Sequence, residues 1–137
     1  MKVTNKPILL VDDDQVESMT VTRALKEIHV MNQVVHRENG EDALNYLKDE
    51  TNDKPCIILL DLNMPVMNGI EFLEAVKKDK RVRRIPVVML TTSDVQQDKL
   101  NSFNLGAVGY MPKPAGYGQF VEVIRSIDTY WTISEMP

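Results

Sequence analysis

Short apolar runs that alternate with longer amphipathic segments are the feature that most limits the folds open to this chain. The runs are residues 7–11 (PILLV), 33–36 (QVVH), 57–60 (IILL), 87–90 (VVML) and 108–111 (VGYM). An uninterrupted apolar run indicates a strand that is buried on both faces. Such strands are typical of a parallel sheet that is covered by helices on both sides.

Apolar side chains recur at helical spacing in the segments that follow the runs, as Val21 and Leu25 do in residues 15–29. The pattern therefore predicts a (βα)5 α/β fold with a doubly wound, five-stranded parallel sheet. The other helices are expected to begin after a cap at Asn39, near residue 68, after a cap at Ser93 or Asp94, and near residue 117, and Gly106 is expected to end the fourth.

Length and charge limit the class of protein. The chain has 137 residues, which suits a single domain over residues 1–137 with one sizeable core. Its net charge is −4, and no basic stripe of the kind that nucleic-acid binding needs is visible. The apolar runs are too short to span a membrane, the N-terminus has no signal-peptide pattern, and the single cysteine, Cys56, has no partner for an internal disulfide. We therefore expect a cytoplasmic protein that binds neither membrane nor nucleic acid.

Polar side chains follow the apolar runs at the points where the strands should end. Asp12 and Asp13 follow the first run, Asp61 the third, Thr91 the fourth and Lys113 the fifth. The carboxyl ends of the strands form the ligand edge of a doubly wound sheet, so these side chains are expected to lie close together. Three carboxylates at one edge would repel each other, and one ammonium group does not balance them.

A hard divalent cation with oxygen ligands would balance this charge, so Mg²⁺ is the expected cofactor and Mn²⁺ could replace it. Asp61 follows the central strand and is the carboxylate best placed to attack phosphorus and form an acyl phosphate. The Thr91 hydroxyl and the Lys113 ammonium group would then bind the phosphoryl oxygens. The expected catalytic residues are therefore Asp61, Thr91 and Lys113. The histidines, His29 and His36, are expected to lie too far from the strand ends to take part.

Four motifs closely resemble those of the receiver domain of bacterial two-component response regulators. They are VDDD at 11–14, LDLNMPVMNG at 60–69, LTTS at 90–93 and GYMPKP at 109–114. The resemblance spans about residues 7–127, which would form the core of a flavodoxin-like receiver fold, with 128–137 as a short aromatic helical extension. It implies a signalling protein that catalyses only its own phosphorylation and dephosphorylation.

The resemblance also assigns a role to each motif residue. Asp61 would accept a phosphoryl group from the phosphohistidine of a sensor histidine kinase. The implied metal site consists of Asp12, Asp13, Asp61 and the backbone carbonyl of Asn63.

The remaining motif residues would form the switch. Thr91 would move toward the phosphoryl group, Tyr110 would change its rotamer in response, and the Lys113–Pro114 peptide bond is expected to be cis. The surface of the fourth helix, last strand and last helix would then change.

The C-terminal residues 120–137 and the connection VRRIP at 82–86 look like those of stand-alone receivers that partner bacterial phytochrome-type kinases. The expected output is a protein contact, including a homodimer through the switching surface or the C-terminal tail. Trp131 could either close the core or contribute to such an interface. A kinase helix is expected to dock at the entry to Asp61, beside Asp14, Gln15 and Met19 and the loop that contains Pro114 and Ala115.

Three alternatives use related chemistry. A phosphorelay intermediate would pass the phosphoryl group from Asp61 to a histidine phosphotransfer protein, and the sequence does not separate it from a terminal switch. A haloacid-dehalogenase-type phosphatase needs an acid where Asn63 stands. A flavodoxin-like cofactor binder needs a phosphate cradle where residues 11–14 (VDDD) would repel phosphate.

Overall fold

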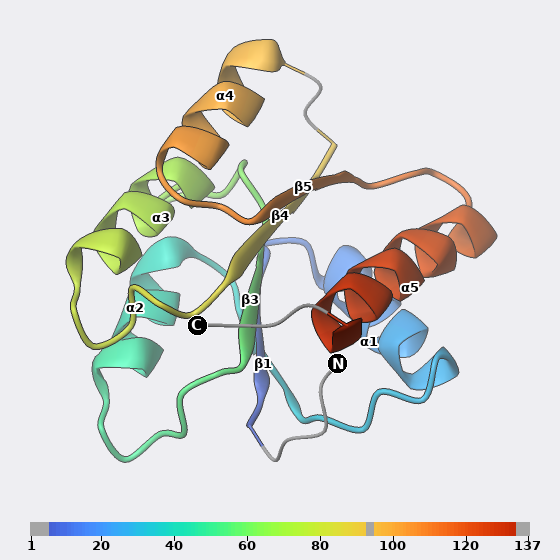
Figure 1. The fold of residues 1–137 in the computed structure, drawn as a ribbon, viewed down its shortest axis with the longest axis horizontal. Helices are drawn as coiled ribbons and strands as arrows, with labels where there is room; N and C mark the ends of the chain where they lie inside the picture. The colour runs from blue at the N-terminus through green and yellow to red at the C-terminus, as the bar shows by residue number, and fades with distance from the viewer. Residues whose placement is uncertain (1–5, 93–94, 134–137) are drawn as a thin grey trace.

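The computed structural model describes residues 6–92 and 95–133, with side chains up to Thr129. Five parallel strands form one sheet in the order β2-β1-β3-β4-β5 (Figure 1). The strands are β1 (Ile8–Val11), β2 (Val34–Arg37), β3 (Ile57–Leu60), β4 (Val87–Thr91) and β5 (Gly109–Pro112). The helices are α1 (Gln15–Glu27), α2 (Gly40–Lys48), α3 (Gly69–Lys78), α4 (Gln96–Asn104) and α5 (Tyr117–Ile133). Each strand precedes a helix, so the predicted (βα)5 doubly wound fold is confirmed.

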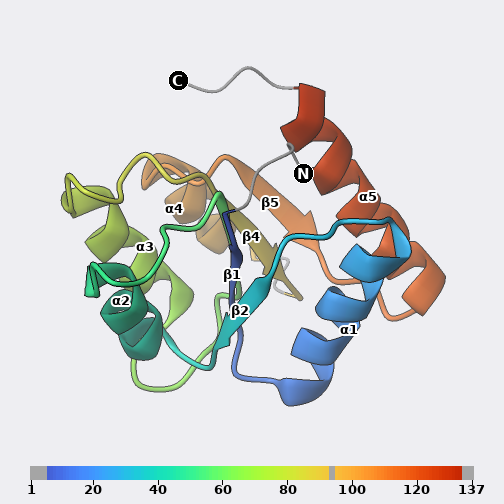
Figure 2. The ribbon, with the colours of Figure 1, turned by 90° about the horizontal axis from the view of Figure 1, so that it is seen from below.

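The helices cover the sheet on both faces, with α1 and α5 on one side and α2, α3 and α4 on the other (Figures 1 and 2). Successive side chains of a strand point to opposite faces, so each strand contributes to two cores. In β3, Ile58 and Leu60 pack with Phe72 of α3, whereas Ile57 and Leu59 belong to the core with α1 and α5. All four β3 residues are fully buried, as the uninterrupted apolar run predicted.

Most helix ends follow the sequence signals, and one does not. The Asn39 side chain accepts a hydrogen bond from the backbone N–H of Asp42 as the expected N-cap of α2. Gly106 follows α4 with a φ of 101°, a left-handed conformation that favours glycine. The prediction that Ser93 or Asp94 caps α4 is wrong, because the cap position is Val95 and makes no side-chain capping bond. Residues 93 and 94 themselves lie outside the described residues.

The C-terminal helix begins at the predicted position. It continues without interruption from Tyr117 to Ile133, so the extension from residue 128 is helical as far as residue 133 and is continuous with α5. The side chain of Trp131 lies outside the described side chains, so its predicted alternatives stay predictions. Among the described residues, no helix is long and apolar enough to cross a membrane.

The loop from β3 to α3 is held close to the end of β3. Gly69, the first residue of α3, donates its backbone N–H to the Leu62 carbonyl at 2.9 Å. A Cβ atom at this position would lie 2.3 Å from the carbonyl oxygen of Asp61, so no side chain fits without moving the loop. The preceding residue, Asn68, caps α3 in a reciprocal capping box with Glu71. Glycine therefore lets the helix start directly behind Asp61.

We predict that Gly69→Ala lowers the free energy of unfolding by about 2 kcal/mol, because the added methyl group overlaps backbone rather than a movable side chain. Gly118→Ala in α5 is the matched control, since nothing lies within 4 Å of its added Cβ. Urea denaturation of both variants measures the difference. Equal stability of the two variants would contradict the close approach.

Candidate functional site

The carboxyl ends of β1 and β3 place two acids next to each other. Val11 and Leu60 are paired in the parallel register, so the residues that follow them, Asp12 and Asp61, leave the sheet side by side. The Asp61 backbone N–H donates to the Val11 carbonyl at 3.0 Å, and that of Asp12 donates to the Arg37 carbonyl at 3.0 Å. Both acids are therefore anchored by the sheet ladder itself.

Three carboxylates form the candidate metal site. One oxygen each from Asp12, Asp13 and Asp61 lie within 4.8 Å of one another. Asp12 and Asp61 are buried, and Asp13 is exposed, so the cluster opens to solvent on one side. Hard oxygen donors in a partly open arrangement fit Mg²⁺ or Mn²⁺ with retained water ligands. The expected proximity of these three acids is confirmed by the geometry.

Burial raises the pKa of Asp61 above its usual range. The Lys113 ammonium group counteracts this rise, the charge of Asp12 adds to it, and backbone hydrogen bonds from Asn63 and Leu62 lower the pKa. The backbone of Asn63 is thus hydrogen-bonded to the Asp61 side chain. Ligation of a metal by its carbonyl stays a prediction. Its side chain lines a neighbouring pocket of about 410 Å³ together with Met64, Asn68, Ile70 and Asp98.

Lys113 is the cation of the site. Its Nζ lies 2.8 Å from Asp12 Oδ2 and 3.6 Å from Asp61 Oδ2, and the side chain is 5% exposed. Burial by itself lowers the pKa of Lys113, but hydrogen bonds to Asp12 and Glu17 and the nearby acid charges outweigh burial and raise it. The ammonium group therefore stays protonated while it holds the carboxylates together.

Glu17 in the first turn of α1 is the site residue that the sequence interpretation missed. Its Oε2 lies 2.5 Å from Lys113 Nζ, closer than either aspartate. Asp14 is the N-cap, accepting hydrogen bonds from the backbone N–H groups of Val16 and Glu17. This cap turns α1 so that Glu17 faces the acids. The available signal was its position in the first turn of a helix that begins directly after the acids Asp12 and Asp13.

Thr91 and Tyr110 lie on neighbouring strands. Thr91 is fully buried at the end of β4, and Tyr110 in β5 is paired in register with Met89, two residues earlier in β4. Tyr110 is partly buried against the core on the α2–α4 side, and its ring centroid lies 6.4 Å from that of Phe103 in α4. These positions bring Thr91 to the acid edge and Tyr110 next to α4.

The prediction of a cis bond between Lys113 and Pro114 is wrong, because the described residues contain no cis peptide bond. The trans form of a prolyl bond is the lower in energy by about 0.5–1 kcal/mol. Here the Lys113 backbone N–H donates to the Thr91 carbonyl at 2.9 Å. This bond to the end of β4 positions Lys113 at the acid edge without a cis bond.

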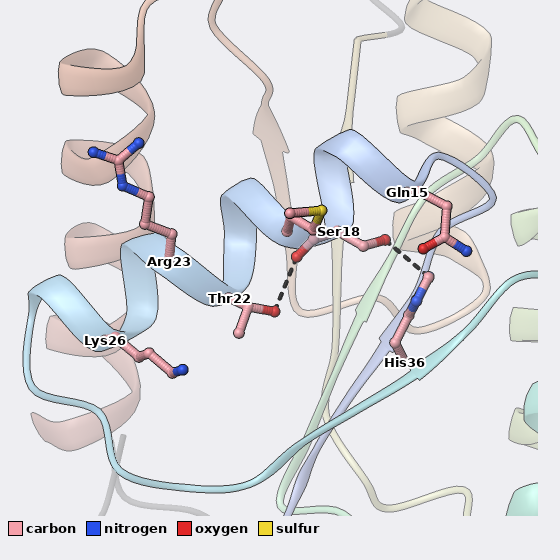
Figure 3. Close-up of a pocket in the computed structure, with 7 residues that line it drawn as sticks. Gln15, Ser18, Thr22, Arg23, Lys26 and His36 are labelled. Carbon is pink, nitrogen blue, oxygen red and sulfur yellow. Dashed lines mark hydrogen bonds between the residues drawn. The ribbon is translucent and has the colours of Figure 1, made fainter.

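His36 lies nearer to the site than predicted. Its Nε2 lies 2.6 Å from the carbonyl oxygen of Asp12. The same nitrogen lies 2.8 Å from Ser18 Oγ (Figure 3). The prediction that it is remote from the strand ends was therefore wrong, because the β1–β2 register pairs Leu10 with His36. Its contact is with the backbone of Asp12, so it supports the loop that carries the acids. His29 lies at the other end of α1 with a φ of 65°.

A shallow pocket of about 410 Å³ lies beside α1 (Figure 3). Met19, which contributes to it, is 71% exposed, and so is Val16 in the same helix. The pocket is lined by Gln15, Ser18, Met19, Thr22, Arg23, Lys26 and His36. Apolar surface is thus exposed on the helix that begins next to the acid cluster.

This combination of fold and site defines a class of protein. The chain belongs to the response regulator receiver domain family, whose model matches residues 8–125.

The relatives are response regulators, and some of them are named as phytochrome response regulators. Response regulator Rcp1 from Synechocystis sp. is 32% identical over 130 residues, which cover 92% of this chain and 88% of Rcp1. The Mn²⁺-bound form of Rcp1 superposes with a TM-score of 0.87 at 31% identity, covering 96% of this chain and 99% of that structure. The phosphorylated cyanobacterial phytochrome response regulator RcpA has a TM-score of 0.90 at 33% identity, with 98% and 99% covered.

A bacteriophytochrome response regulator, AtBRR, is also similar, with a TM-score of 0.75, 34% identity, and 96% of this chain and 99% of that structure covered. The resemblance to stand-alone receivers of phytochrome systems is therefore confirmed.

We predict that Asp61→Asn stabilises the metal-free protein at pH 7 by about 1 kcal/mol. Since burial raises the pKa of Asp61, the folded state binds its proton more tightly than the unfolded chain. Below the unfolded pKa the Asp61 carboxyl is protonated in both states and does not change the free energy of unfolding. As the pH rises through the interval between the unfolded and folded pKa values, ionisation of Asp61 lowers the free energy of unfolding, and the loss is complete above that interval. Urea unfolding in EDTA at several pH values measures the gain.

The same variant should gain less stability from Mg²⁺ than the wild type, because it has lost one charged ligand of the cluster. Asp53→Asn, at an exposed position outside the cluster, is the matched control and should behave like the wild type. An Asp61→Asn protein that is less stable than the wild type in EDTA would contradict this account of the site's electrostatics.

Proposed function

We propose that this chain is a single-domain response regulator that is phosphorylated on Asp61 by a sensor histidine kinase. The observation that carries the proposal is the position of Asp61. It is buried at the end of the central strand, within 4.8 Å of the oxygens of Asp12 and Asp13, and 3.6 Å from the Lys113 ammonium group. The proposed domain covers the whole chain, residues 1–137, and its similarity to RcpA over 98% of this chain supports that extent.

In the proposed reaction, an Asp61 carboxylate oxygen attacks the phosphorus of a phosphohistidine. The new bond is a mixed anhydride, the P–N bond breaks, and its electron pair stays on the imidazole nitrogen, which takes up a proton. A divalent cation bound by Asp12, Asp13, Asp61 and the Asn63 carbonyl would neutralise the phosphoryl oxygens. Lys113 and the Thr91 hydroxyl would bind the remaining oxygens.

The expected partner is a histidine kinase of the phytochrome type, since the relatives RcpA and AtBRR are named as phytochrome and bacteriophytochrome response regulators. The pocket beside α1 and the exposed side chain of Met19 support docking of the kinase helix there. Gln15 and Met19 line this pocket. Pro114 and Ala115, which follow Lys113 in the loop after β5, would flank the entry to Asp61.

The output surface in this proposal is α4-β5-α5. Phosphorylation would draw Thr91 inward and allow Tyr110 to turn beside α4. Conversion of a mostly inactive population to a mostly active one requires roughly 3–5 kcal/mol of differential stabilisation, and charge-assisted hydrogen bonds from Thr91 and Lys113 reach that scale. Exposed apolar side chains are present on this face for a partner or a second copy, namely Val95, Leu100, Phe103 and Val108.

The alternative role as a phosphorelay intermediate uses the same chemistry at Asp61. No contact among the described residues favours it over a terminal switch. The terminal switch is therefore the function proposed.

We predict that acetyl phosphate or a phosphorylated phytochrome-type kinase transfers a phosphoryl group to the protein in the presence of Mg²⁺. Phosphate-affinity gel electrophoresis should detect the product, which should be absent with EDTA and in Asp61→Asn because the nucleophile or its cation is missing. Asp53→Asn is the matched control and should react normally. Phosphorylation of Asp61→Asn at the wild-type rate would exclude Asp61 as the acceptor.

The same assay tests docking at α1. A Gln15→Ala/Met19→Ala variant should react with acetyl phosphate as the wild type does and should receive phosphate from the kinase about tenfold more slowly, because the pair lines the proposed docking pocket. An unchanged rate from the kinase would remove α1 from the docking model.

We predict that beryllofluoride, a phosphoryl mimic, changes the molar mass of the Mg²⁺-loaded protein in size-exclusion chromatography with light scattering. Dimers should form through the α4-β5-α5 surface or the C-terminal tail, and Asp61→Asn should prevent the change. A dimer of constant mass in both states would show that assembly is independent of phosphorylation, and a monomer throughout would rule out an output by dimerisation.

A further inference from the structure

The Lys113 ammonium group is shared among three carboxylates, and the phosphoacceptor is the most distant of them. Nζ lies 2.5 Å from Glu17 Oε2, 2.8 Å from Asp12 Oδ2 and 3.6 Å from Asp61 Oδ2. An ammonium group has three N–H donors and no acceptor. In this structure its two shorter contacts are with Glu17 and Asp12, and its contact with Asp61 is the longest of the three.

Glu17 is not part of the three-carboxylate cluster of the metal site. Its side chain is 36% exposed, whereas that of Lys113 is 5% exposed, so the pair lies at the boundary between the buried site and solvent. Burial raises the pKa of the Glu17 carboxyl, and the Lys113 ammonium group counteracts that rise. Glu17 is thus held near the site by its ion pair with Lys113 and by its place in the first turn of α1.

The proposed phosphorylation adds a second anionic group that would bind the same ammonium group, and would bind it more strongly. A phosphoryl group carries a charge of about −1.5 to −2 near pH 7 and strong acceptor oxygens. For Lys113 to bind one of those oxygens, its Nζ must move from the α1 side toward Asp61. The contact with Glu17 would have to lengthen or break, and the Glu17 charge would also repel the incoming anion.

We propose that Glu17 is a positioning residue that holds the Lys113 ammonium group on the α1 side of the unphosphorylated site and so competes with the phosphoryl group for it. This inference rests on the proposed phosphorylation of Asp61. Breaking the Glu17–Lys113 ion pair costs free energy, so Lys113 stabilises the bound phosphoryl group less than it would without Glu17. Anion binding is therefore weaker, and the phosphorylated state is shorter-lived.

The competition can be measured with beryllofluoride in the presence of saturating Mg²⁺, followed by fluorine NMR. Glu17→Gln keeps the size of the side chain and removes its charge. It should bind beryllofluoride about three- to tenfold more tightly than the wild type, the effect of one unit charge near a partly solvated anion site. The acyl phosphate formed from acetyl phosphate should also decay more slowly in this variant.

Glu38→Gln is the matched control, because Glu38 is an exposed acid just after β2 whose side chain is hydrogen-bonded to Gln15 rather than to Lys113. It should bind beryllofluoride within twofold of the wild type. A second readout separates positioning from damage to the fold. Loss of structure in Glu17→Gln would weaken both beryllofluoride and Mg²⁺ binding, whereas release of Lys113 tightens the binding of the anion without tightening that of the cation.

The outcomes distinguish this inference from the function on which it rests. Equal beryllofluoride affinity in Glu17→Gln and the wild type would overturn the competition and leave phosphorylation of Asp61 intact. An equal gain in beryllofluoride affinity in Glu38→Gln would also overturn the competition, since the gain would then come from the change in net charge and not from the Glu17–Lys113 pair. A wild-type protein that binds no beryllofluoride with Mg²⁺ present would overturn both the proposed function and this inference.

Discussion

The mutual repulsion of acids at one edge of the sheet is the constraint on which the rest of this structure depends. The parallel register of β1 and β3 brings Asp12 and Asp61 together, and the buried sheet leaves them little water. Lys113, which follows β5, reduces the repulsion between these two carboxylates by its ion pairs with both of them. The remaining repulsion between the carboxylates would be offset by a bound divalent cation.

Backbone hydrogen bonds and close packing around Asp12 and Asp61 restrain their positions. Both acids donate their backbone N–H groups to neighbouring strands, and His36 contacts the Asp12 carbonyl from the edge strand. Behind Asp61, the absence of a side chain at Gly69 lets α3 start against the Asp61 carbonyl. A rigid arrangement of this kind positions charged groups in advance, so that binding or chemistry does not have to reorganise them.

The Lys113 ammonium group is paired with Glu17 of helix α1 as well as with the acids that follow the strands. The pair places a fourth carboxylate in contact with the Lys113 ammonium group. In a receiver whose two states differ by a few kcal/mol, one such contact is large enough to shift the populations. If Asp61 is phosphorylated as proposed, a substitution in α1 would therefore shift the balance of the two states without changing Asp61 itself.

The sequence by itself determined the fold class and the acid edge, because uninterrupted apolar runs leave few alternatives to a covered parallel sheet and the residues after those runs must meet at one end of it. Local signals also placed the Asn39 cap and the end of α4 at Gly106. Only the tertiary structure decided which partner each charge takes. The Lys113–Glu17 contact spans 96 positions, and it depends on how the end of β5 lies against α1, which no local pattern encodes.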